Sequence, residues 1–568
     1  MPGPKAPSPF CVRLHVDADR DGKVDDDATS THKWTWGPGG RGAVALVNSD
    51  ADSGLPQADY SDSLVNGADD VKDLAPLELR CKGAIPPGTD VILSVDDTAV
   101  VRVFDSLSVA GKEILGPTAG ASYVVPAPLP PVMHLGFEAT RYADGGYDGI
   151  FHIELSLHNG TTKYPVQSVK IRAAPWMMLD HTRPAIRVYV SETAANGAFL
   201  TDLANKLAST GVPLTPTPTF DPWMQDCMEF GVSSSPTQTL PAVVRAPRVY
   251  TKSQPPHTRS ELNDYARTLR SADLGFHDPH PETAPPDSTT FDSTGNLEVS
   301  PPVTSKRGKH YPFGRIYYGG QSRRYGSVIE EISPHLRKFL KAQRVQEPIS
   351  LDTTWLSVGH VDEFMTFLPK GPKGFTLLLA SPSLALDTLE GLGSSSAATI
   401  FQGRQWPHHG LIETSVGDLL KNGAAGKSWK ELRKFNRWCQ SRIDSSKKRL
   451  IRELGLDAPK DILEAPQLYI DAHGPDAADA FTGGMVNMLV VNGHCVVPQP
   501  FGPAVSNPGG SGFTDLFELD LGNKMHALGL THKFVDCWDT YHVNMGEIHC
   551  GTNTLRQAPL LRWWEFKP

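Results

Sequence analysis

The sequence has little of what would place it among disulfide-rich, zinc-binding or membrane proteins. It has seven cysteines in 568 residues, an odd number, and no C-x-x-C pair. Neither a disulfide framework nor a structural zinc site is therefore expected, and a reducing compartment fits better. No apolar run approaches the roughly 18 residues that a membrane span needs. The opening segment MPGPKAPSPF also lacks the apolar stretch of a secretion signal. We therefore expect a cytoplasmic protein that makes no membrane contact.

An excess of positive charge is also missing. The chain has 54 Lys and Arg residues against 63 Asp and Glu residues, which gives a net charge of -9. Nucleic-acid-binding proteins usually show a basic face, so we expect no nucleic-acid partner. A chain of 568 residues is too long for one ordinary core, so two or more domains are expected. Length and composition leave the oligomeric state open.

The texture of the sequence changes near residue 173. Before it, short β-branched segments such as CVRLHV, LELRC, DVILSV and FHIELSL recur at the spacing of a β-sandwich. After it, strand-like segments alternate with helix-like ones. The clearest helix begins at Ser428, which forms a capping box with Glu431, and its spacing places Cys439 in the core. A second helix has Ser333 as its N-cap. We therefore predict an α+β protein with a β-sandwich over 1–173 and an α/β catalytic domain over 174–568.

One stretch lacks both helix and strand patterns. Residues 250–296 are polar and rich in Pro, His, Ser and Thr. This composition predicts a long surface loop.

Three segments contain residues suited to catalysis. FDPWMQDCMEFG carries Trp223, Asp226 and Glu229, and GEIHCGTNTLR carries Cys550. SVGHVDEF carries His360 and Asp362, whose side chains would leave the same face of an extended chain. A thiol and an imidazole suggest nucleophilic catalysis. The two carboxylates add a preference for a planar cation with several N–H donors, and a guanidinium has that form.

These residue types support one reaction. A thiolate of Cys550 attacks the guanidinium carbon, His360 donates a proton to the departing ammonia, and water cleaves the covalent thiouronium to leave a ureido group. Each residue also has a simpler interpretation: Cys550 as a packing residue and His360 as the partner of Asp362. His542 and His549 are interpreted as structural. Spacing alone leaves both interpretations open.

Five long motifs, in order along the chain, resemble those of the protein-arginine deiminases. They are WMQDCMEFG, STGNLEVSPPVTSKRGKHYPFGRI, WLSVGHVDEFMTFLP, MVNMLVVNGHCVVPQPFGP and YHVNMGEIHCGTN. The resemblance implies an immunoglobulin-like β-sandwich followed by a five-bladed α/β propeller, and citrulline formation in proteins or peptides. It implies Cys550 as nucleophile, His360 as general acid and base, and Asp226 and Asp362 as the guanidinium clamp. It also implies that Trp223 lines the substrate channel and that Arg248 contacts the substrate backbone.

Ca²⁺ is the expected cofactor, because clustered carboxylates repel one another unless a cation neutralises them. Two acidic groups lie in the β-rich part, and their positions resemble the family's calcium ligands. The expected ligands there are Asp17, Asp19, Asp21, Asp25, Asn48, Asp50, Asp52, Asp70 and Asp73, joined by Asp273 from the catalytic domain. Within the catalytic domain the resemblance implies a further site formed by Gln225, Glu229 and Glu298.

A neighbouring calcium site of the family is expected to be lost. The corresponding residues are poor ligands for a hard cation: Cys227, Arg245, Ala246 and Val249. We hypothesise that the guanidinium of Arg245 supplies the positive charge that calcium supplies elsewhere. Two family arginines near the channel mouth correspond here to Tyr250 and Asn544, so binding of the substrate backbone is expected to differ. A deiminase of free arginine or another small guanidine, and a non-catalytic calcium-binding protein, are the alternative functions.

Overall fold

The structure is a computed structural model that describes residues 11–24, 33–52, 57–219, 221–248, 260–279, 289–320, 324–325, 328–329, 331–474, 476–507 and 510–567. Over these residues the chain is α+β, with many strands and few helices. None of the helices in the described part has the length and apolar character needed to cross a bilayer.

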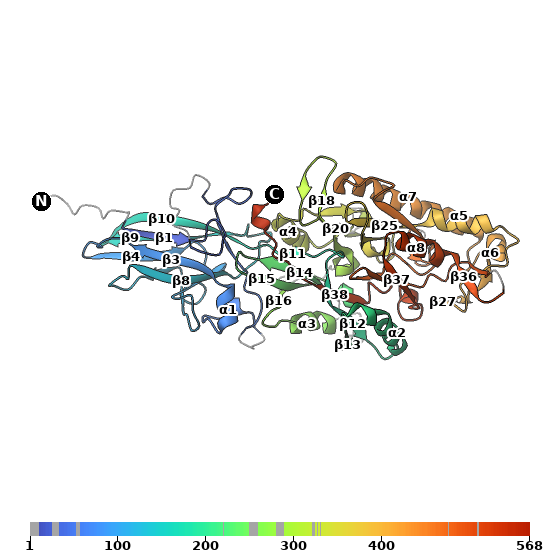
Figure 1. Cartoon of the computed structure of the whole chain (residues 1–568), viewed down its shortest axis with the longest axis horizontal. Helices are drawn as coiled ribbons and strands as arrows, with labels where there is room; N and C mark the ends of the chain where they lie inside the picture. The colour runs from blue at the N-terminus through green and yellow to red at the C-terminus, as the bar shows by residue number, and fades with distance from the viewer. Residues whose placement is uncertain are drawn as a thin grey trace.

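The first part of the chain forms two five-stranded sheets (Figure 1). In spatial order, one contains β1 (Val12–Val16), β3 (Ala75–Cys81), β8 (Val132–Ala139), β5 (Val101–Phe104) and β6 (Glu113–Leu115). The other contains β2 (Ala43–Ala45), β10 (Thr162–Ala173), β9 (Ile150–Asn159), β4 (Thr89–Val95) and β7 (Ser122–Val124). Apolar side chains of both sheets share one core, which includes Leu14, Leu77, Leu93, Phe137 and Phe151. The two sheets therefore pack against each other as a β-sandwich.

The rest of the chain repeats one small unit five times in its described residues. In each unit two antiparallel strands are followed by a helical crossover to a third strand, which lies parallel to the second. The strand triplets are β38 (Thr552–Arg556), β12 (Ala185–Glu192) and β13 (Leu214–Pro218); β14 (Met228–Ser234), β15 (Thr239–Arg245) and β16 (Gly275–His277); β17 (Leu297–Val299), β20 (Ile316–Gly319) and β23 (Ile349–Leu351); β24 (Met365–Pro369), β25 (Phe375–Ser381) and β30 (Ile462–Pro466); and β33 (Leu489–Val491), β34 (His494–Pro498) and β37 (Thr531–Val535).

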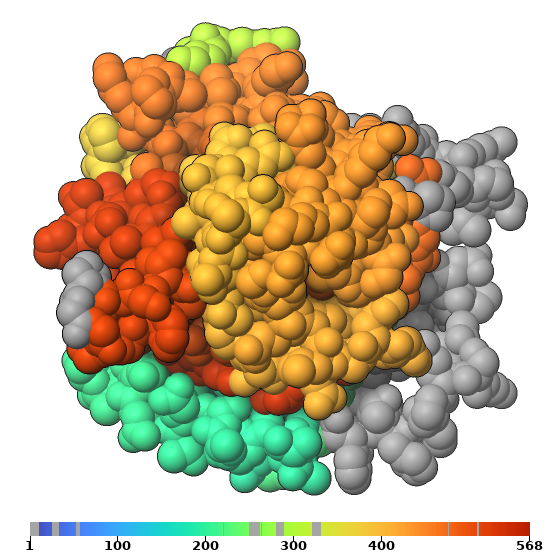
Figure 2. Space-filling view, turned by 90° about the vertical axis from the view of Figure 1, so that its right-hand side faces the viewer, coloured from blue at the N-terminus to red at the C-terminus, as the bar shows by residue number. Residues whose placement is uncertain are grey.

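The crossovers carry most of the helices. These are α2 (Gly197–Leu207), α3 (Ser260–Thr268), α4 (Pro334–Ala342), α5 (Pro382–Leu392), α6 (Val416–Asn422), α7 (Trp429–Leu454) and α8 (Leu516–Ala527). Smaller elements are α1 (Ala68–Asp73), β11 (Met177–Met178), β18 (Val303–Thr304), β19 (His310–Tyr311), β21 (Arg324–Tyr325), β22 (Val328–Ile329), β26 (Thr399–Ile400), β27 (Gln405–Trp406), β28 (Gly410–Leu411), β29 (Thr414–Ser415), β31 (Tyr469–Ile470), β32 (Asp479–Ala480), β35 (Ala504–Ser506) and β36 (Phe513–Asp515). Figure 2 shows the end of the molecule covered by α5 to α7, with the region of α2 along its lower edge.

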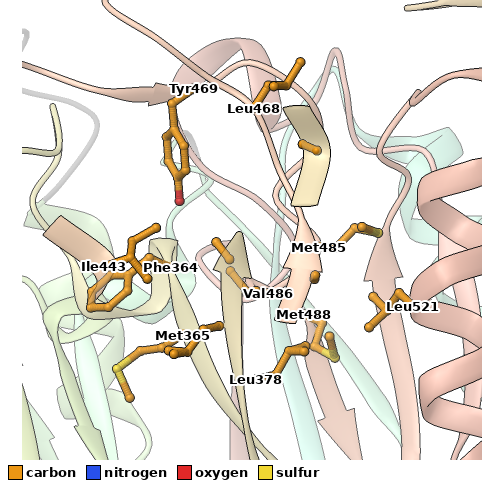
Figure 3. Packing of buried hydrophobic residues seen from close by; sticks show 14 of the residues in the cluster. Phe364, Met365, Leu378, Ile443, Leu468, Tyr469, Met485, Val486, Met488 and Leu521 are labelled. Atoms are coloured by element: carbon orange, nitrogen blue, oxygen red, sulfur yellow. The ribbon is translucent and has the colours of Figure 1, made fainter. Parts of the chain in front are cut away.

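One pairing joins the two ends of this second part. β38, close to the C-terminus, pairs antiparallel with β12, the first long strand after the sandwich, with Asn553 opposite Tyr189. β38, the last strand of this part, completes the sheet that β12 and β13 begin. Separating the chain ends would therefore remove a strand from that sheet. The main core lies between sheets and helices, as Figure 3 shows for Phe364, Leu378, Ile443 and Leu521.

The helix signals read from the sequence are confirmed. The Ser428 hydroxyl accepts from the Glu431 N–H, and the Glu431 carboxylate accepts from the Ser428 N–H, at the start of α7. Ser333 caps α4 by accepting from the His335 N–H. Cys439 is fully buried in the main core. In each case a local pattern was enough, because capping and helical spacing involve neighbours in the chain.

Two expectations about local structure are wrong. Residues 250–296 do not form one surface loop, because α3, β16 and the buried turn around Gly295 lie within them; residues 249–259 and 280–288 lie outside the described part. The segment with His360 and Asp362 is not a continuous strand. His360 is extended, but Asp362 lies in a short 3-10 helix, Val361–Glu363, so the side-chain alternation of an extended chain does not apply to this pair. The His360 N–H donates to the Glu363 carboxylate at 2.7 Å, which stabilises this turn.

Candidate active site

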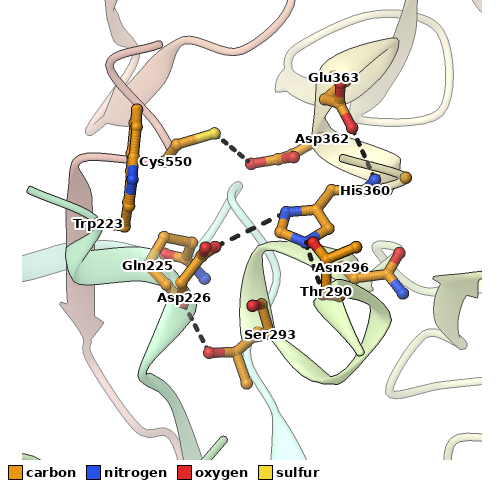
Figure 4. A network of polar contacts seen from close by, with 12 residues as sticks. Trp223, Gln225, Asp226, Thr290, Ser293, Asn296, His360, Asp362, Glu363 and Cys550 are labelled. Atoms are coloured by element: carbon orange, nitrogen blue, oxygen red, sulfur yellow. Dashed lines mark hydrogen bonds and ion pairs between the residues drawn. The ribbon is translucent and has the colours of Figure 1, made fainter. Parts of the chain in front are cut away.

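The predicted catalytic residues occupy equivalent places in the repeated units. Asp226 comes before β14, Asp362 before β24, and Cys550 before β38. Gly295 comes before β17 and Asn487 before β33. The site is therefore formed where five chain segments enter the first strands of five sheets. Residues more than 300 positions apart meet there, and Figure 4 shows Cys550, Asp362, His360 and Asp226 around one small region.

Cys550 is buried between two polar side chains. Its Sγ–H donates to Oδ2 of Asp362 at 3.3 Å, and the amide of Asn487 donates to Sγ at 3.2 Å. Asn487 Oδ1 also accepts from the Cys550 N–H at 3.2 Å, so one side chain fixes both the thiol and its backbone. Burial raises the pKa of the Cys550 thiol well above its usual value, and the charges of Asp362 and Asp226 raise it further. The free site therefore favours the thiol, and a cation is needed to favour the thiolate.

His360 faces Asp226. Its Nε2 donates to the Thr290 carbonyl at 2.8 Å, and its Nδ1 lies 3.6 Å from Oδ1 of Asp226. Because a carbonyl only accepts, this contact fixes the tautomer and leaves Nδ1 as the nitrogen that can exchange a proton. A Cβ on Gly295 would lie 2.8 Å from Asp226 Oδ1 and 2.9 Å from His360 Nδ1, so only glycine allows this approach.

The two carboxylates each keep one buried oxygen without a hydrogen bond. Within the described part of the chain, neither Oδ1 of Asp226 nor Oδ1 of Asp362 has a hydrogen-bond partner. A buried carboxylate oxygen without a donor is costly, so such pairs occur where a ligand supplies the donors. A guanidinium offers N–H groups along two edges and can satisfy both oxygens at once.

The two predicted substrate-binding residues lie beside this clamp. Trp223 packs over Gly546, where an added Cβ would come within 2.2 Å of the indole, and its ring lies 5.5 Å from that of Tyr541. Figure 4 shows the indole beside Cys550. Arg248 donates to the Ser293 hydroxyl at 2.7 Å and lies 3.6 Å from Oδ2 of Asp226. Both residues are thus within reach of a molecule held by Asp226.

Two side chains that contact the site, Asn487 and His549, were not predicted from the sequence. Asn487 lies in MVNMLVVNGHC, a family motif whose residue types alone indicate no catalytic role. His549 was interpreted as structural, yet its Nδ1 contacts Oδ2 of Asp362 at 2.9 Å and its Nε2 lies 3.2 Å from Oε1 of Glu298. Burial opposes the charged form of His549, but Glu298 and Asp362 outweigh it and raise its pKa to about 9. In return, the His549 hydrogen bond and charge outweigh burial and lower the pKa of Asp362. Its position next to Cys550 was the available signal.

The acidic groups of the β-sandwich are arranged as a cation would require. Carboxylate oxygens of Asp50, Asp52 and Asp73 lie within 4.8 Å of one another. Burial, then the charge of Asp73, raises the pKa of Asp50 to about 9, and burial raises that of Asp73 to about 8. The Asn48 amide donates to Asp70 at 3.0 Å and to Glu138 at 2.8 Å. Several buried oxygens have no partner in the described part: both of Asp50, both of Asp52, and one each of Asn48, Asp59, Asp73 and Glu138.

The other expected sandwich ligands differ in exposure. Asp17, Asp19 and Asp21 also come within 4.8 Å of one another, with Asp17 buried and the other two exposed. Asp25 lies outside the described residues. Asp273 is exposed, and its charge contributes to raising the pKa of Asp52, which places it near the Asp50 group. Oxygen-rich clusters of this kind suit a hard cation such as Ca²⁺.

The expected set in the catalytic domain does not form an open oxygen site. Gln225 donates to Oε2 of Glu229 at 2.7 Å, and the two oxygens of Glu298 lie 3.2 Å from Nε2 of His181 and of His549. The guanidinium of Arg556 lines the same small cavity. These three residues, as arranged, do not fit a hard cation held by oxygen alone.

The residues of the site expected to be lost are also not available to a metal. Arg245 donates to Oδ2 of Asp278 at 2.6 Å, which ties the end of β15 to the residue after β16. Cys227 is buried and donates to the Met224 carbonyl at 3.2 Å, and Ala246 is buried. Asn544 is the exposed last residue of the short helix His542–Asn544, while Val249 and Tyr250 lie outside the described part.

Comparison with known proteins places these motifs in one family. The model of the protein-arginine deiminase domain matches residues 164–565, and that of the protein-arginine deiminase middle domain matches residues 11–159. Human protein-arginine deiminase type-3 is 33% identical over 590 residues, covering 98% of this chain and 83% of that protein. The mouse type-4 enzyme is 35% identical over 589 residues, and the human type-1 enzyme 34% over 585, again covering 98% of this chain and 83% and 82% of the relatives. The chain belongs to the protein-arginine deiminase family.

Proposed function

We propose that this chain hydrolyses the guanidinium of arginine side chains in proteins and peptides, which yields citrulline and ammonia through a covalent thiouronium on Cys550. The observation that carries the proposal is the pair of unsatisfied buried oxygens, Asp226 Oδ1 and Asp362 Oδ1, beside a buried thiol. Family membership over nearly the whole chain supports the same reaction.

Substrate binding prepares the nucleophile. The guanidinium lies between Asp226 and Asp362, and its positive charge offsets the two negative charges that raise the pKa of Cys550. The thiol proton passes to Nδ1 of His360, and Sγ, already beside Asp362, attacks the guanidinium carbon. Trp223 covers the apolar part of the arginine side chain, and Asn487 keeps Sγ in place.

Two steps complete the reaction. The carbon–sulfur bond gives a tetrahedral adduct, and protonation of one amino group by Nδ1 of His360 releases it as ammonia, leaving the thiouronium. Water then enters, gives a proton to Nδ1 of His360 and attacks the carbon of the thiouronium. The carbon–sulfur bond breaks, and citrulline leaves with the water oxygen as its ureido oxygen. The Thr290 carbonyl keeps His360 in the tautomer that both steps use.

The decisive experiment measures citrulline from a blocked arginine peptide and from free arginine with the same enzyme. We expect the peptide to react with at least a tenfold higher kcat/KM. The α-ammonium and α-carboxylate of free arginine would bring two charges to the channel mouth, where the blocked peptide has neutral amides. A higher value for free arginine would support the small-guanidine alternative instead. No product from either substrate would support the non-catalytic one.

Two finer features belong to this proposal. The five repeated sheets, closed by β38 on β12, support a five-bladed α/β propeller over residues 174–568, preceded by an immunoglobulin-like sandwich over 1–173. The unsatisfied oxygens around Asp50 support Ca²⁺ binding in the sandwich, where the ion would neutralise the clustered carboxylates. Its role there is to stabilise the fold, and no catalytic step passes through it.

A further inference from the structure

Two histidines and a glutamate meet next to Asp362 of the active site. Nε2 of His181 and Nε2 of His549 each lie 3.2 Å from an oxygen of Glu298, and the two rings are 5.3 Å apart. All three donor atoms lie within 4.8 Å of one another. Donors around a tetrahedral zinc ion, with bonds of about 2.0–2.2 Å, are about 3.3–3.6 Å apart, so small shifts would bring this set around an ion.

The second ring nitrogen of each histidine is held in place. His549 Nδ1 contacts Oδ2 of Asp362 at 2.9 Å, and His181 Nδ1 contacts the Thr366 hydroxyl at 3.2 Å. Metal-binding histidines usually have this arrangement, in which a carboxylate or hydroxyl orients the ring and leaves the other nitrogen free to coordinate. Here it directs both Nε2 atoms toward the same carboxylate.

The donor set decides which ion fits. Two imidazoles and one carboxylate suit zinc and neighbouring transition metals, whereas Ca²⁺ takes six to eight oxygens. This set differs from the sandwich cluster, where, among the residues that the structure describes, buried carboxylate oxygens lack partners and no histidine takes part. A cavity of about 20 Å³ adjoins the histidines and is lined by Gln225, Glu229 and Asn553, which leaves room for one water as a further ligand.

We propose that His181, His549 and Glu298 form a binding site for a divalent transition-metal ion of the zinc class, in place of a calcium site at this position. An ion on the two Nε2 atoms would displace the protons that they share with Glu298, while Asp362 would keep its contact with His549. The guanidinium of Arg556 lies in the same cavity, but its N–H groups are directed at the carbonyls of Arg183 and Val490, at 3.0 and 3.1 Å. One of the three ligands, His549, directly precedes the nucleophile Cys550 in the chain.

Co²⁺ is the probe that tests the proposal, because its visible absorption reports ligand type and number. The full chain is titrated with Co²⁺ in excess Ca²⁺, so that the oxygen clusters of the sandwich are already filled. We expect one Co²⁺ per chain with the spectrum of a site with nitrogen ligands. His181→Ala should weaken binding at least tenfold, and His181→Asn, which keeps a polar group beside Glu298, should do the same.

Two further variants separate this site from others. His152→Ala removes a histidine that pairs with Asp96 in the sandwich, and it should bind Co²⁺ as the parent does. Cys550→Ala removes the nearby thiol, and it should leave the spectrum unchanged. Unchanged affinity in both His181 variants would overturn the proposal. So would a sulfur-to-cobalt charge-transfer band that Cys550→Ala abolishes, since the ion would then sit on the nucleophile. The titration needs no turnover, so it stands apart from the proposed reaction.

Discussion

Sγ of Cys550 lies 3.3 Å from Oδ2 of Asp362, the same oxygen that contacts His549 at 2.9 Å. One carboxylate oxygen therefore faces both the nucleophile and a buried histidine, while its second oxygen has no partner in the described part of the chain. Asp362 can keep its position through His549 and still accept from a guanidinium. We propose that this arrangement, together with Asp226, holds the substrate carbon next to the sulfur.

Replacing Cys550 with serine should abolish citrulline formation. A hydroxyl in this acidic, buried place is far harder to ionise than a thiol, so we expect kcat to fall by at least about 10⁴-fold. Substrate binding should persist because the clamp is intact. Citrulline assays together with a peptide-binding measurement check this, with Cys81→Ser in β3 as the matched control. Residual activity above about 1% would show that another group is the nucleophile.

Asp226→Asn keeps the shape of the side chain and removes its charge. The clamp then loses about two charge-assisted hydrogen bonds of roughly 1.5 kcal/mol each, so kcat/KM should fall by about 100-fold. Initial rates on a blocked arginine peptide give the value. Asp202→Asn, on α2, should leave the rate within a factor of about two. A loss smaller than fivefold for Asp226→Asn would mean that this carboxylate does not hold the guanidinium.

The rate at which iodoacetamide alkylates Cys550 should rise with pH throughout the neutral and alkaline range. Burial and then the Asp362 and Asp226 charges raise the pKa of the thiol, so the reactive thiolate is scarce near neutrality and increases as pH rises. Asp362→Asn removes the charge with the larger effect on the thiol and should shift the profile to lower pH. Asp226→Asn should shift it less. A profile that does not move in Asp362→Asn would contradict this electrostatic account.

Ca²⁺ should stabilise the protein. The effect of Asp73→Asn on Tm should have opposite signs in chelator and in excess Ca²⁺. In chelator, removing one of the repelling carboxylates near Asp50 should raise Tm. In excess Ca²⁺ the same change removes a ligand and should lower Tm. Saturating the site at about 100 times Kd contributes about 2.7 kcal/mol, a shift that thermal unfolding detects readily. Equal shifts in both conditions would argue against a cation at this cluster.

The Arg245 hypothesis gives a prediction in chelator. Arg245 is paired with Asp278 at 2.6 Å, which holds its charge in a fixed place. If this charge replaces a calcium ion, the parent should keep much of its activity in chelator, and Arg245→Asp should lose at least tenfold there and recover in excess Ca²⁺. Arg245→Lys, which keeps the charge, should behave like the parent. Equal chelator activity of Arg245→Asp and the parent would refute the hypothesis.

Local patterns predicted much of the fold. The capping box at Ser428 and the N-cap at Ser333 involve near neighbours, so the sequence was sufficient for α7 and α4. The alternating strands of the first 173 residues likewise predicted two packed sheets. Residues 250–296 were misjudged, because a polar composition does not exclude a short helix and strand that pack on β15. The turn at Asp362 was not predicted. The hydrogen bond from the His360 N–H to the Glu363 carboxylate stabilises it, and no general sequence pattern indicates that contact.

The sequence by itself determined the family and predicted the nucleophile, the imidazole and the two carboxylates, because long motifs and residue chemistry are readable without coordinates. Only the tertiary structure decided how they act together. Asn487 on the thiol, the tautomer of His360, and His549 between Asp362 and Glu298 all depend on contacts between segments that meet at the entrances of five sheets. Such contacts join residues up to about 370 positions apart, such as His181 and His549, and sequence spacing carries no information about them.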